Sequence, residues 1–264
     1  MGRTRVARLA TLGVVGLVLS ACGDDSVTSE SSVVTEAPAS ITPGRDGDVI
    51  DLGDGGDYAV EIDPADFTDV VDNPFLAYRP GMRWVYEERS PDGELQVITI
   101  EVLDETRNVM GVNTVVVHDQ VTGEGGDLVE DTFDWYAQDT DGSVWYFGED
   151  TTSYQEDGTI SHDGAWEAGI DGALPGIVMP GSPTPSDIGY RQEYQQGEAE
   201  DMGQIIDVAN GVVITRDWTP LDPDVIEEKT YLTGVGFVYE IQTEGDGAGT
   251  TATLTEYRSA AMTS

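Results

Sequence analysis

From residue 83 onward the sequence repeatedly alternates apolar and polar side chains, and this period of two is typical of strands in a sheet with one buried face. One such segment is Val129–Tyr136, VEDTFDWY, and another is Val235–Gln242, VGFVYEIQ. The same reasoning gives further candidate strands at 83–89, 95–103, 112–121, 143–148, 189–195, 203–208, 212–218, 225–232 and 250–257.

Turn signals lie between the candidate strands. Each is an Asp or Asn followed by glycine, which supplies the positive φ of a tight hairpin turn. Sequential hairpins predict an all-β fold, a single antiparallel meander of about ten strands. Because a flat sheet of that size would expose apolar surface to water, we expect it to curl into a barrel or a strongly bent open sheet, lipocalin-like in outline. The signals are Asp92-Gly93, Asp141-Gly142, Asp157-Gly158, Asn210-Gly211 and Asp246-Gly247.

One segment, residues 166–187, does not fit the meander. Its sequence, WEAGIDGALPGIVMPGSPTPSD, is apolar, rich in proline and glycine, and without a period. Ordered loops of this length are uncommon in compact domains and are usually functional. We therefore expect a long loop that crosses one end or face of the sheet, either as a structural plug or as a lid over a ligand cavity. Its candidate ligand-contacting residues are Trp166, Leu174, Ile177 and Met179.

The N-terminus predicts export. Three arginines precede an apolar run of 11 residues, Leu9 to Leu19, which is shorter than the roughly 20 residues that a membrane-spanning helix needs. This pattern is typical of a secretory signal peptide. The next residues, Leu19-Ser20-Ala21-Cys22, resemble the lipobox of bacterial lipoproteins. In that family the cysteine thiol receives a diacylglycerol and becomes the first residue after cleavage. The resemblance implies a signal peptide at 1–21, lipidation of Cys22, and a location at the cell membrane on its extracytoplasmic face.

Cys22 is also the only cysteine of the chain. An exported protein can form disulfides, but this chain has no second thiol with which to form one. The mature protein therefore depends on its packed core for stability, and it has no free thiolate nucleophile and no cysteine-based metal site.

The charge balance limits the partners. The chain has 51 acidic residues against 12 lysines and arginines, a net charge of −39. Removal of the signal peptide takes three arginines with it and makes the mature charge −42. Such a surface excludes nucleic acid, whose phosphates require clustered Lys and Arg, and it repels anionic lipid headgroups, so the lipid alone must provide the membrane contact. Salt adaptation and divalent cation binding both remain open as reasons for the acidity.

The composition also divides the chain into regions. Residues 22–66 contain Ser, Thr, Pro, Gly and Asp with almost no aromatic side chains, which predicts a lipidated cysteine followed by a disordered acidic linker. Residues 67–258 are expected to form a single β domain, and residues 259–264 a flexible tail.

Several longer segments resemble an uncharacterised family of exported β-rich bacterial proteins. The similarity spans most of residues 70–240 and implies one exported all-β domain. It transfers no catalytic residue. The segments that carry it are NPFLAYRPGMRWVYE (73–87), VEDTFDWYAQDTDGSVWYFGED (129–150), GALPGIVMP (172–180), YRQEY and GEAED within 190–201, and GVGFVYE (234–240).

Two groups of carboxylates are candidate metal ligands, because clustered hard oxygen atoms suit Ca²⁺. One is Glu198, Glu200 and Asp201, and the other is Asp139 and Asp141, which with Glu149 and Asp150 flank a predicted hairpin. The motif Asp-x-Asp-Gly is equally typical of a plain hairpin turn. An EF-hand would need Asp at 137 and Glu at 148, where this chain has Ala and Gly. No cofactor is required by the sequence, and Ca²⁺ is the one that these carboxylates would take.

The sequence gives no sign of an enzyme. It contains no Gly-x-Ser-x-Gly nucleophile motif, and its two histidines lack the spacing of a zinc site. The leading prediction is a non-catalytic domain that binds a small apolar or amphiphilic ligand under the 166–187 loop. One alternative is binding or hydrolysis of carbohydrate or cell-wall glycan by tryptophans and paired carboxylates. Another is an acidic Ca²⁺-binding or structural module.

Overall fold

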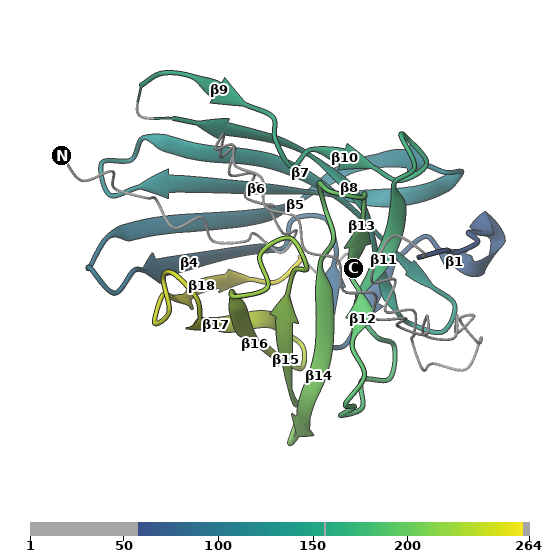
Figure 1. Cartoon of the computed structure of the whole chain (residues 1–264). Helices are drawn as coiled ribbons and strands as arrows, with labels where there is room; N and C mark the ends of the chain where they lie inside the picture. The colour runs from purple at the N-terminus through teal and green to yellow at the C-terminus, as the bar shows by residue number, and fades with distance from the viewer. Residues whose placement is uncertain (1–57, 156, 261–264) are drawn as a thin grey trace, which may run out of the picture.

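The computed structural model describes residues 58–155 and 157–260, and these form an almost entirely β structure (Figure 1). The only helical segment assigned in them is one 3-10 turn, η1 (Pro64–Asp66). No stretch of the described residues has the helical length and hydropathy of a membrane span. The predicted signal peptide, Cys22, most of the linker and most of the C-terminal tail lie outside the described residues.

Two five-stranded antiparallel meanders build the main sheet. The first consists of β4 (Arg83–Arg89), β5 (Leu95–Val109), β6 (Val112–Gly123), β7 (Leu128–Asp139) and β8 (Val144–Tyr154). The second consists of β14 (Met202–Ala209), β15 (Val212–Trp218), β16 (Ile226–Leu232), β17 (Gly236–Glu244) and β18 (Thr251–Arg258). They join where β18 pairs with β4, with Leu254 opposite Tyr86.

The other ends of the two meanders meet at a seam. β11 (Leu174–Met179) extends the first meander at β8, and β13 (Glu193–Tyr194) pairs with β11. β12 (Tyr190–Arg191) pairs with β14 of the second meander. Because only Gln192 separates β12 from β13, this stretch connects both ends and nearly closes the sheet into a barrel. The predicted all-β barrel is confirmed, with more strands than the ten expected.

The additional strands are short. They are β1 (Phe67–Thr68), β2 (Val71–Asn73), β3 (Leu76–Tyr78), β9 (Ile160–Ser161) and β10 (Trp166–Glu167). At the start of the described chain, the Tyr58 hydroxyl donates a hydrogen bond to the Pro175 carbonyl at 2.8 Å. The chain therefore contacts the seam before it enters the sheet. The domain boundary at residue 67 stays a prediction.

The prediction of one uninterrupted loop at 166–187 is corrected, because this segment contains both β10 and β11. All residues of β11 after its first are buried. A strand that is buried on both faces reads as a continuous apolar run without a period of two, so alternation could not reveal it. Gly176 permits the close packing, since a Cβ there would lie 2.4 Å from the carbonyl carbon of Gln192.

The polar side of two strands is the buried side. In β7, Glu130, Thr132 and Asp134 are buried, whereas the intervening Asp131 and Phe133 are partly exposed. β17 shows the same inversion, because its Glu240 is 1% exposed while the flanking Tyr239 and Ile241 are partly exposed. Alternation ordinarily places the apolar residues inside. Here the curvature of the sheet brings the carboxylates of many strands together on its inner face.

Candidate functional site

A cluster of buried carboxylates is the most unusual chemical feature of the domain, since Asp and Glu are almost never fully buried unless they are paired. Its members come from both meanders and from the seam. The cluster consists of Glu88, Asp119, Glu130, Asp134, Glu149, Glu193, Asp201, Asp217, Glu227 and Glu240, each at most 9% exposed. We call this set the carboxylate cluster.

Lys229 is the only lysine of the chain and the principal cation inside this cluster. Its side chain is 3% exposed, and its Nζ lies 3.0 Å from Asp217 Oδ2, 3.6 Å from Glu227 Oε2 and 3.7 Å from Glu240 Oε2. Burial by itself lowers the pKa of Lys229, but Asp217, Glu240 and Glu227 together raise it well above its usual value. The three carboxylates therefore favour the protonated, positively charged form of Lys229.

Several carboxylates of the cluster have raised pKa values, chiefly because they are buried and also because their negative charges repel one another. Burial, followed by repulsion from Glu227 and Glu130, raises the pKa of Glu88 to about 8. Burial likewise raises the pKa of Asp134 to about 7, although the hydrogen bond from the Tyr146 hydroxyl, 2.7 Å long, opposes the shift. These groups carry protons at pH values where free carboxyl groups are ionised.

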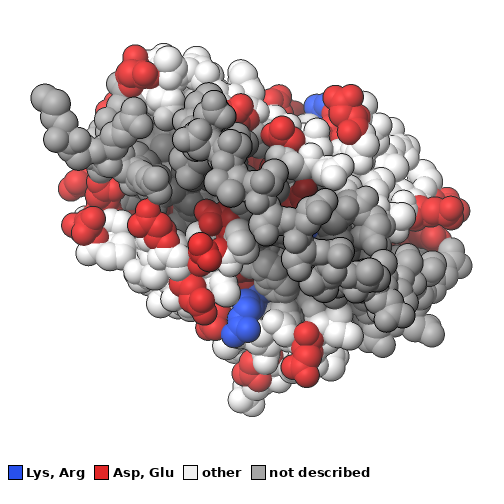
Figure 2. Space-filling model, viewed as in Figure 1, with Lys and Arg blue, Asp and Glu red and all other residues white. Residues whose placement is uncertain are grey.

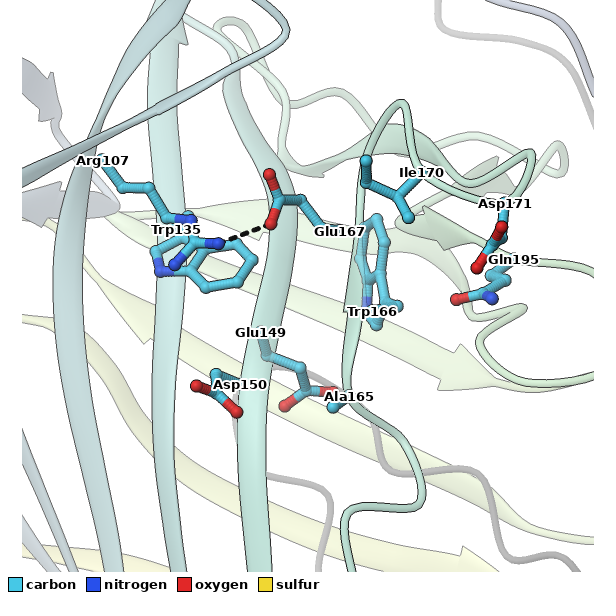
Figure 3. A pocket seen from close by; sticks show the side chains of 10 residues that line it. All are labelled: Arg107, Trp135, Glu149, Asp150, Ala165, Trp166, Glu167, Ile170, Asp171 and Gln195. Carbon is cyan, nitrogen blue, oxygen red and sulfur yellow. Dashed lines mark hydrogen bonds and ion pairs between the residues drawn. The ribbon is translucent and has the colours of Figure 1, made fainter.

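A pocket of about 280 Å³ lies beside the cluster, where β10 covers β8 (Figure 3). Two indole rings and the side chain of Ile170 give it apolar walls, and carboxylates stand around them. Glu149 belongs both to the pocket lining and to the carboxylate cluster. The lining residues are Arg107, Trp135, Glu149, Asp150, Ala165, Trp166, Glu167, Ile170, Asp171 and Gln195.

The close approach of β10 to β8 depends on Gly148. Trp166 pairs with Glu149 and Glu167 pairs with Gly148 across these strands. A Cβ at position 148 would lie 2.3 Å from the Trp166 carbonyl oxygen, and the φ of 127° there disfavours any other residue. Glycine at this position therefore allows the Trp166 side chain to reach the pocket.

Internal contacts hold the two tryptophans in place. The Trp166 Nε1 donates a hydrogen bond to Glu193 Oε2 at 3.1 Å, and the ring meets Tyr146 edge-on with 5.3 Å between centroids. The guanidinium carbon of Arg107 lies 3.9 Å from the centre of the Trp135 ring. Arg107 Nη2 also donates to Glu167 Oε2 at 2.5 Å. One face of Trp135 is thus covered by a cation of the protein itself.

The predicted carboxylate pair Asp139 and Asp141 lies in a hairpin turn. Asp139 Oδ1 accepts hydrogen bonds from the backbone N–H groups of Asp141 (3.0 Å) and Ser143 (2.8 Å). Its Oδ2 accepts from Trp145 Nε1 at 2.8 Å. Both oxygens of Asp139 therefore have partners within the turn, which favours the turn interpretation of this motif over the ion.

The second predicted carboxylate group does not converge on one point. Glu198 is exposed, Asp201 is 3% exposed and belongs to the carboxylate cluster, and Glu200 Oε1 accepts from the Gly197 N–H at 2.6 Å. Among the described residues, no group of three or more His, Cys, Asp or Glu side chains is arranged to hold a metal ion. Calcium binding by Asp139, Asp141, Glu198, Glu200 and Asp201 stays a prediction from sequence.

Of the four predicted ligand-contacting residues, Trp166 lines the pocket. Leu174, Ile177 and Met179 belong to β11, where Ile177 pairs with Trp145 and Met179 with Val144. They form part of the sheet and not a lid.

Sequence reasoning did not select Glu149, Arg107 or Trp135 as site residues. A glycine inside a strand often marks the close approach of another backbone. Gly148, which directly precedes Glu149, was therefore the sequence signal that could have indicated this site. Nothing local distinguishes Arg107 or Trp135. Their meeting depends on the pairing of distant strands.

Figure 2 shows several separate acidic groups on the visible face of the molecule and few basic side chains. Some arginines of the described residues form exposed pairs with carboxylates, such as Arg258 Nη2 with Glu101 Oε1 at 3.0 Å. Exposed pairs of this kind contribute little to stability.

Comparison with known proteins leaves the family open. The sequence matches no protein-family model and no curated protein. A "putative exported protein with YmcC-like fold" from Bacteroides fragilis shares 13% identity and a TM-score of 0.39, over 71% of this chain and 100% of its own. A "putative lipoprotein" from Parabacteroides distasonis shares 13% identity and a TM-score of 0.37, over 70% of this chain and 99% of its own. Likeness at this level does not inform the function.

Proposed function

We propose that this protein is a lipid-anchored, non-catalytic binding protein of the extracytoplasmic membrane face, and that its pocket between β7, β8 and β10 takes a small amphiphilic ligand. The observation that carries the proposal is the pocket itself, in which two indole rings and Ile170 stand beside six charged or polar side chains. A concave site with aromatic walls and polar groups that fix the orientation of a ligand is typical of small-molecule binding.

The size of the pocket favours a small ligand. Its volume of about 280 Å³ is slightly below the roughly 300–1,000 Å³ of drug-sized ligand sites. Trp166, Ile170 and Asp171 come from the segment at 166–187 that was expected to cover a ligand. Part of that segment therefore lines the pocket.

The interior of the barrel is a weaker candidate for an apolar ligand. It holds the carboxylate cluster together with the buried rings of Tyr78, Tyr86 and Tyr136. An apolar ligand there would desolvate carboxylates without pairing them, which is unfavourable. Carbohydrate binding at the pocket is also less favoured, because Arg107 covers a face of Trp135 on which a sugar ring would stack.

The membrane anchor is supported by the sequence around Cys22. We expect wild-type protein in the membrane fraction and a Cys22→Ser variant released from it, because two or more acyl chains are needed for firm attachment. Fractionation together with metabolic labelling by a palmitate analogue measures both. A wild-type protein that stays unlabelled and soluble would contradict the anchor.

The pocket is tested by filling it. Ala165 is exposed and lines the pocket, so an Ala165→Phe variant should fold normally and occupy part of the space. We expect it to weaken binding of a small aromatic amphiphile by about tenfold or more, measured by calorimetry and by tryptophan fluorescence. The probes are phenethylamine, 2-phenylethanol and 3-phenylpropionate, which share a ring and differ in charge.

The matched control is Ala209→Phe, an exposed alanine at the end of β14 that does not line the pocket. Its binding should equal that of wild type. If none of the three probes binds to wild type, the proposed pocket function is wrong.

A further inference from the structure

We propose that the ligand of this pocket is an organic cation, a protonated amine joined to a small apolar body, and that Glu149 holds its charged end. This inference rests on the proposed binding function and adds the chemical class of the ligand. It follows from the charges of the lining, from the state of Glu149 and from the character of the walls.

The lining has excess negative charge. Four carboxylates, Glu149, Asp150, Glu167 and Asp171, face one cation, Arg107. Arg107 is already paired with Glu167 at 2.5 Å. No ion pair with a cation of the described residues involves Glu149, Asp150 or Asp171. A ligand that enters therefore meets Asp150 and Asp171, which have no cationic partner among the described residues, and such a lining attracts cations and repels anions. Glu149 adds its negative charge when it loses its proton on binding.

Glu149 distinguishes this pocket from an ordinary acidic surface. Its side chain is 1% exposed, and neither carboxylate oxygen has a hydrogen-bond partner among the described residues. Buried polar groups are nearly always hydrogen-bonded, and a buried one without a partner is costly. An ammonium group has three N–H donors and a positive charge, so it supplies what both oxygens of Glu149 lack.

The walls favour an organic cation over a metal ion. Ca²⁺ requires six to eight oxygen ligands, whereas the indoles of Trp135 and Trp166 and the side chain of Ile170 offer none. These side chains instead suit an aromatic or alkyl group. One cation of the protein already lies on this lining, because the guanidinium carbon of Arg107 is 3.9 Å from the Trp135 ring centre. The site therefore tolerates a cation–π contact.

The surroundings of Glu149 couple binding to a proton. The pKa of Glu149 is raised well above its usual value, and burial is the largest cause. Repulsion from neighbouring carboxylates raises it further, in the order Asp134, Glu193, Glu130 and Asp201. Asp134 and Glu130 face it from β7, Glu193 from β13, and Asp201 from the residue before β14. Around the pocket, Asp150, Asp171 and the Arg107–Glu167 pair complete the charged groups.

Below its raised pKa, Glu149 is protonated in the free protein. An ammonium ligand then displaces this proton on binding, because the carboxylate form is the one that pairs with it. The affinity for an amine should therefore increase about tenfold per pH unit until Glu149 is ionised in the free protein. A neutral ligand of the same shape should show no such dependence.

The experiment is calorimetric titration with phenethylamine, 2-phenylethanol and 3-phenylpropionate between pH 5 and 8, in buffers of different ionisation enthalpy. We expect the amine to bind about tenfold or more tighter than the alcohol, with proton release, and the acid not to bind. A Glu149→Gln variant should lose this preference and the proton release while it still binds the alcohol. Gln keeps the shape of the protonated side chain and cannot ionise in the interior, so this variant should fold.

Two further variants make the result specific. Asp119→Asn removes another buried member of the carboxylate cluster that does not line the pocket, and it should bind the amine as wild type does. Asp171 is exposed with a φ of 50°, a conformation that Asn tolerates. Asp171→Asn should therefore weaken amine binding a few-fold without affecting the fold.

The outcomes separate this inference from the function on which it rests. If the alcohol or the acid binds as tightly as the amine, and Ala165→Phe blocks that binding, the charge preference is wrong and the binding function stands. If Ca²⁺ alone raises the melting temperature of wild type but not of Glu149→Gln, the site takes a metal ion and the inference is wrong. If no probe binds, both proposals fail.

Discussion

Replacing Lys229 with methionine is expected to lower the free energy of unfolding at pH 8 by about 3–5 kcal/mol. This is the usual cost of removing one partner of a buried ion pair, because the other charge is left uncompensated. The variant leaves Asp217, Glu227 and Glu240 without the ammonium group that lies 3.0–3.7 Å from them. These carboxylates must then remain charged in the interior or take up protons. Urea unfolding at equilibrium measures the loss.

The pH dependence of this loss identifies its cause. The raised pKa of Lys229 means that its stabilising contribution is fully present below the pKa of an unfolded lysine, and so throughout the range from pH 5 to 8. The change with pH comes from the carboxylates, which are more readily neutralised by protons in acid. The penalty should therefore be smaller at pH 5 than at pH 8.

The control for Lys229 is Arg83→Met. Arg83 forms an exposed pair with Glu256 at 3.7 Å, with side-chain exposures of 32% and 74%. Pairs of this kind are worth about 0–1 kcal/mol, so this variant should be nearly as stable as wild type. A Lys229→Met protein with wild-type stability at both pH values would show that Lys229 does not compensate the cluster.

The second large effect is a decline in the stability of the wild-type protein as the pH rises from 5 to 9. The pKa of Glu88 rises from 4.5 to about 8 on folding, and that of Asp134 from 3.8 to about 7. Between the unfolded and folded values, the native state holds protons that the unfolded chain has lost, so stability falls with increasing pH. At 1.36 kcal/mol per pKa unit, Glu88 accounts for a loss of about 4 kcal/mol between pH 5 and 8, and Asp134 for about 3 kcal/mol between pH 5 and 7.

Variants at these positions isolate the effect. Glu88→Gln and Asp134→Asn should each flatten the decline and stabilise the protein at pH 8, because the buried carboxyl group no longer has to be protonated. The adjacent Glu87→Gln, at a side chain that is 43% exposed, is the matched control and should leave the slope unchanged. Thermal melts across this pH range measure the difference.

Surface repulsion could cause a decline in the same direction, since the whole chain is acidic. Salt separates the two causes, because 1 M salt screens exposed charges beyond about 3 Å and buried ones much less. A decline that persists in 1 M salt, and that Glu88→Gln reduces, comes from the interior. Stability that instead rises from pH 5 to 8 would overturn the assignment of raised pKa values.

The hairpins of this protein were predictable from local sequence. Asn210 and Gly211 have φ values of 52° and 79°, which is the conformation of a two-residue hairpin turn that Asn-Gly favours. The turn connects β14 to β15 with Ala209 opposite Val212. Such turns and the flanking strands form through contacts between near neighbours, so their residue types indicate the structure.

The candidate site was predictable only in part. Trp166 was expected to contact a ligand, and it lines the pocket. The remaining members come from β5, β7, β8, β10 with its flanking residues, and the turn after β13, so their convergence depends on pairings between residues far apart in the sequence. Arg107, for example, reaches Glu167 across 60 positions.

The sequence by itself determined that the chain is built of antiparallel strands, because the period of two and the Asx-Gly turns depend only on neighbouring residues. The residues before Cys22 also predict export and lipidation. Which face of each strand is inside was decided by the tertiary structure. A period of two defines two faces without saying which one is concave, and closure of the sheet at Gln192 directs Glu130, Asp134 and Glu240 inward. Only the closed barrel brings these carboxylates together, and there the buried cations Lys229 and Arg191 and the raised pKa values of the carboxyl groups reduce their repulsion.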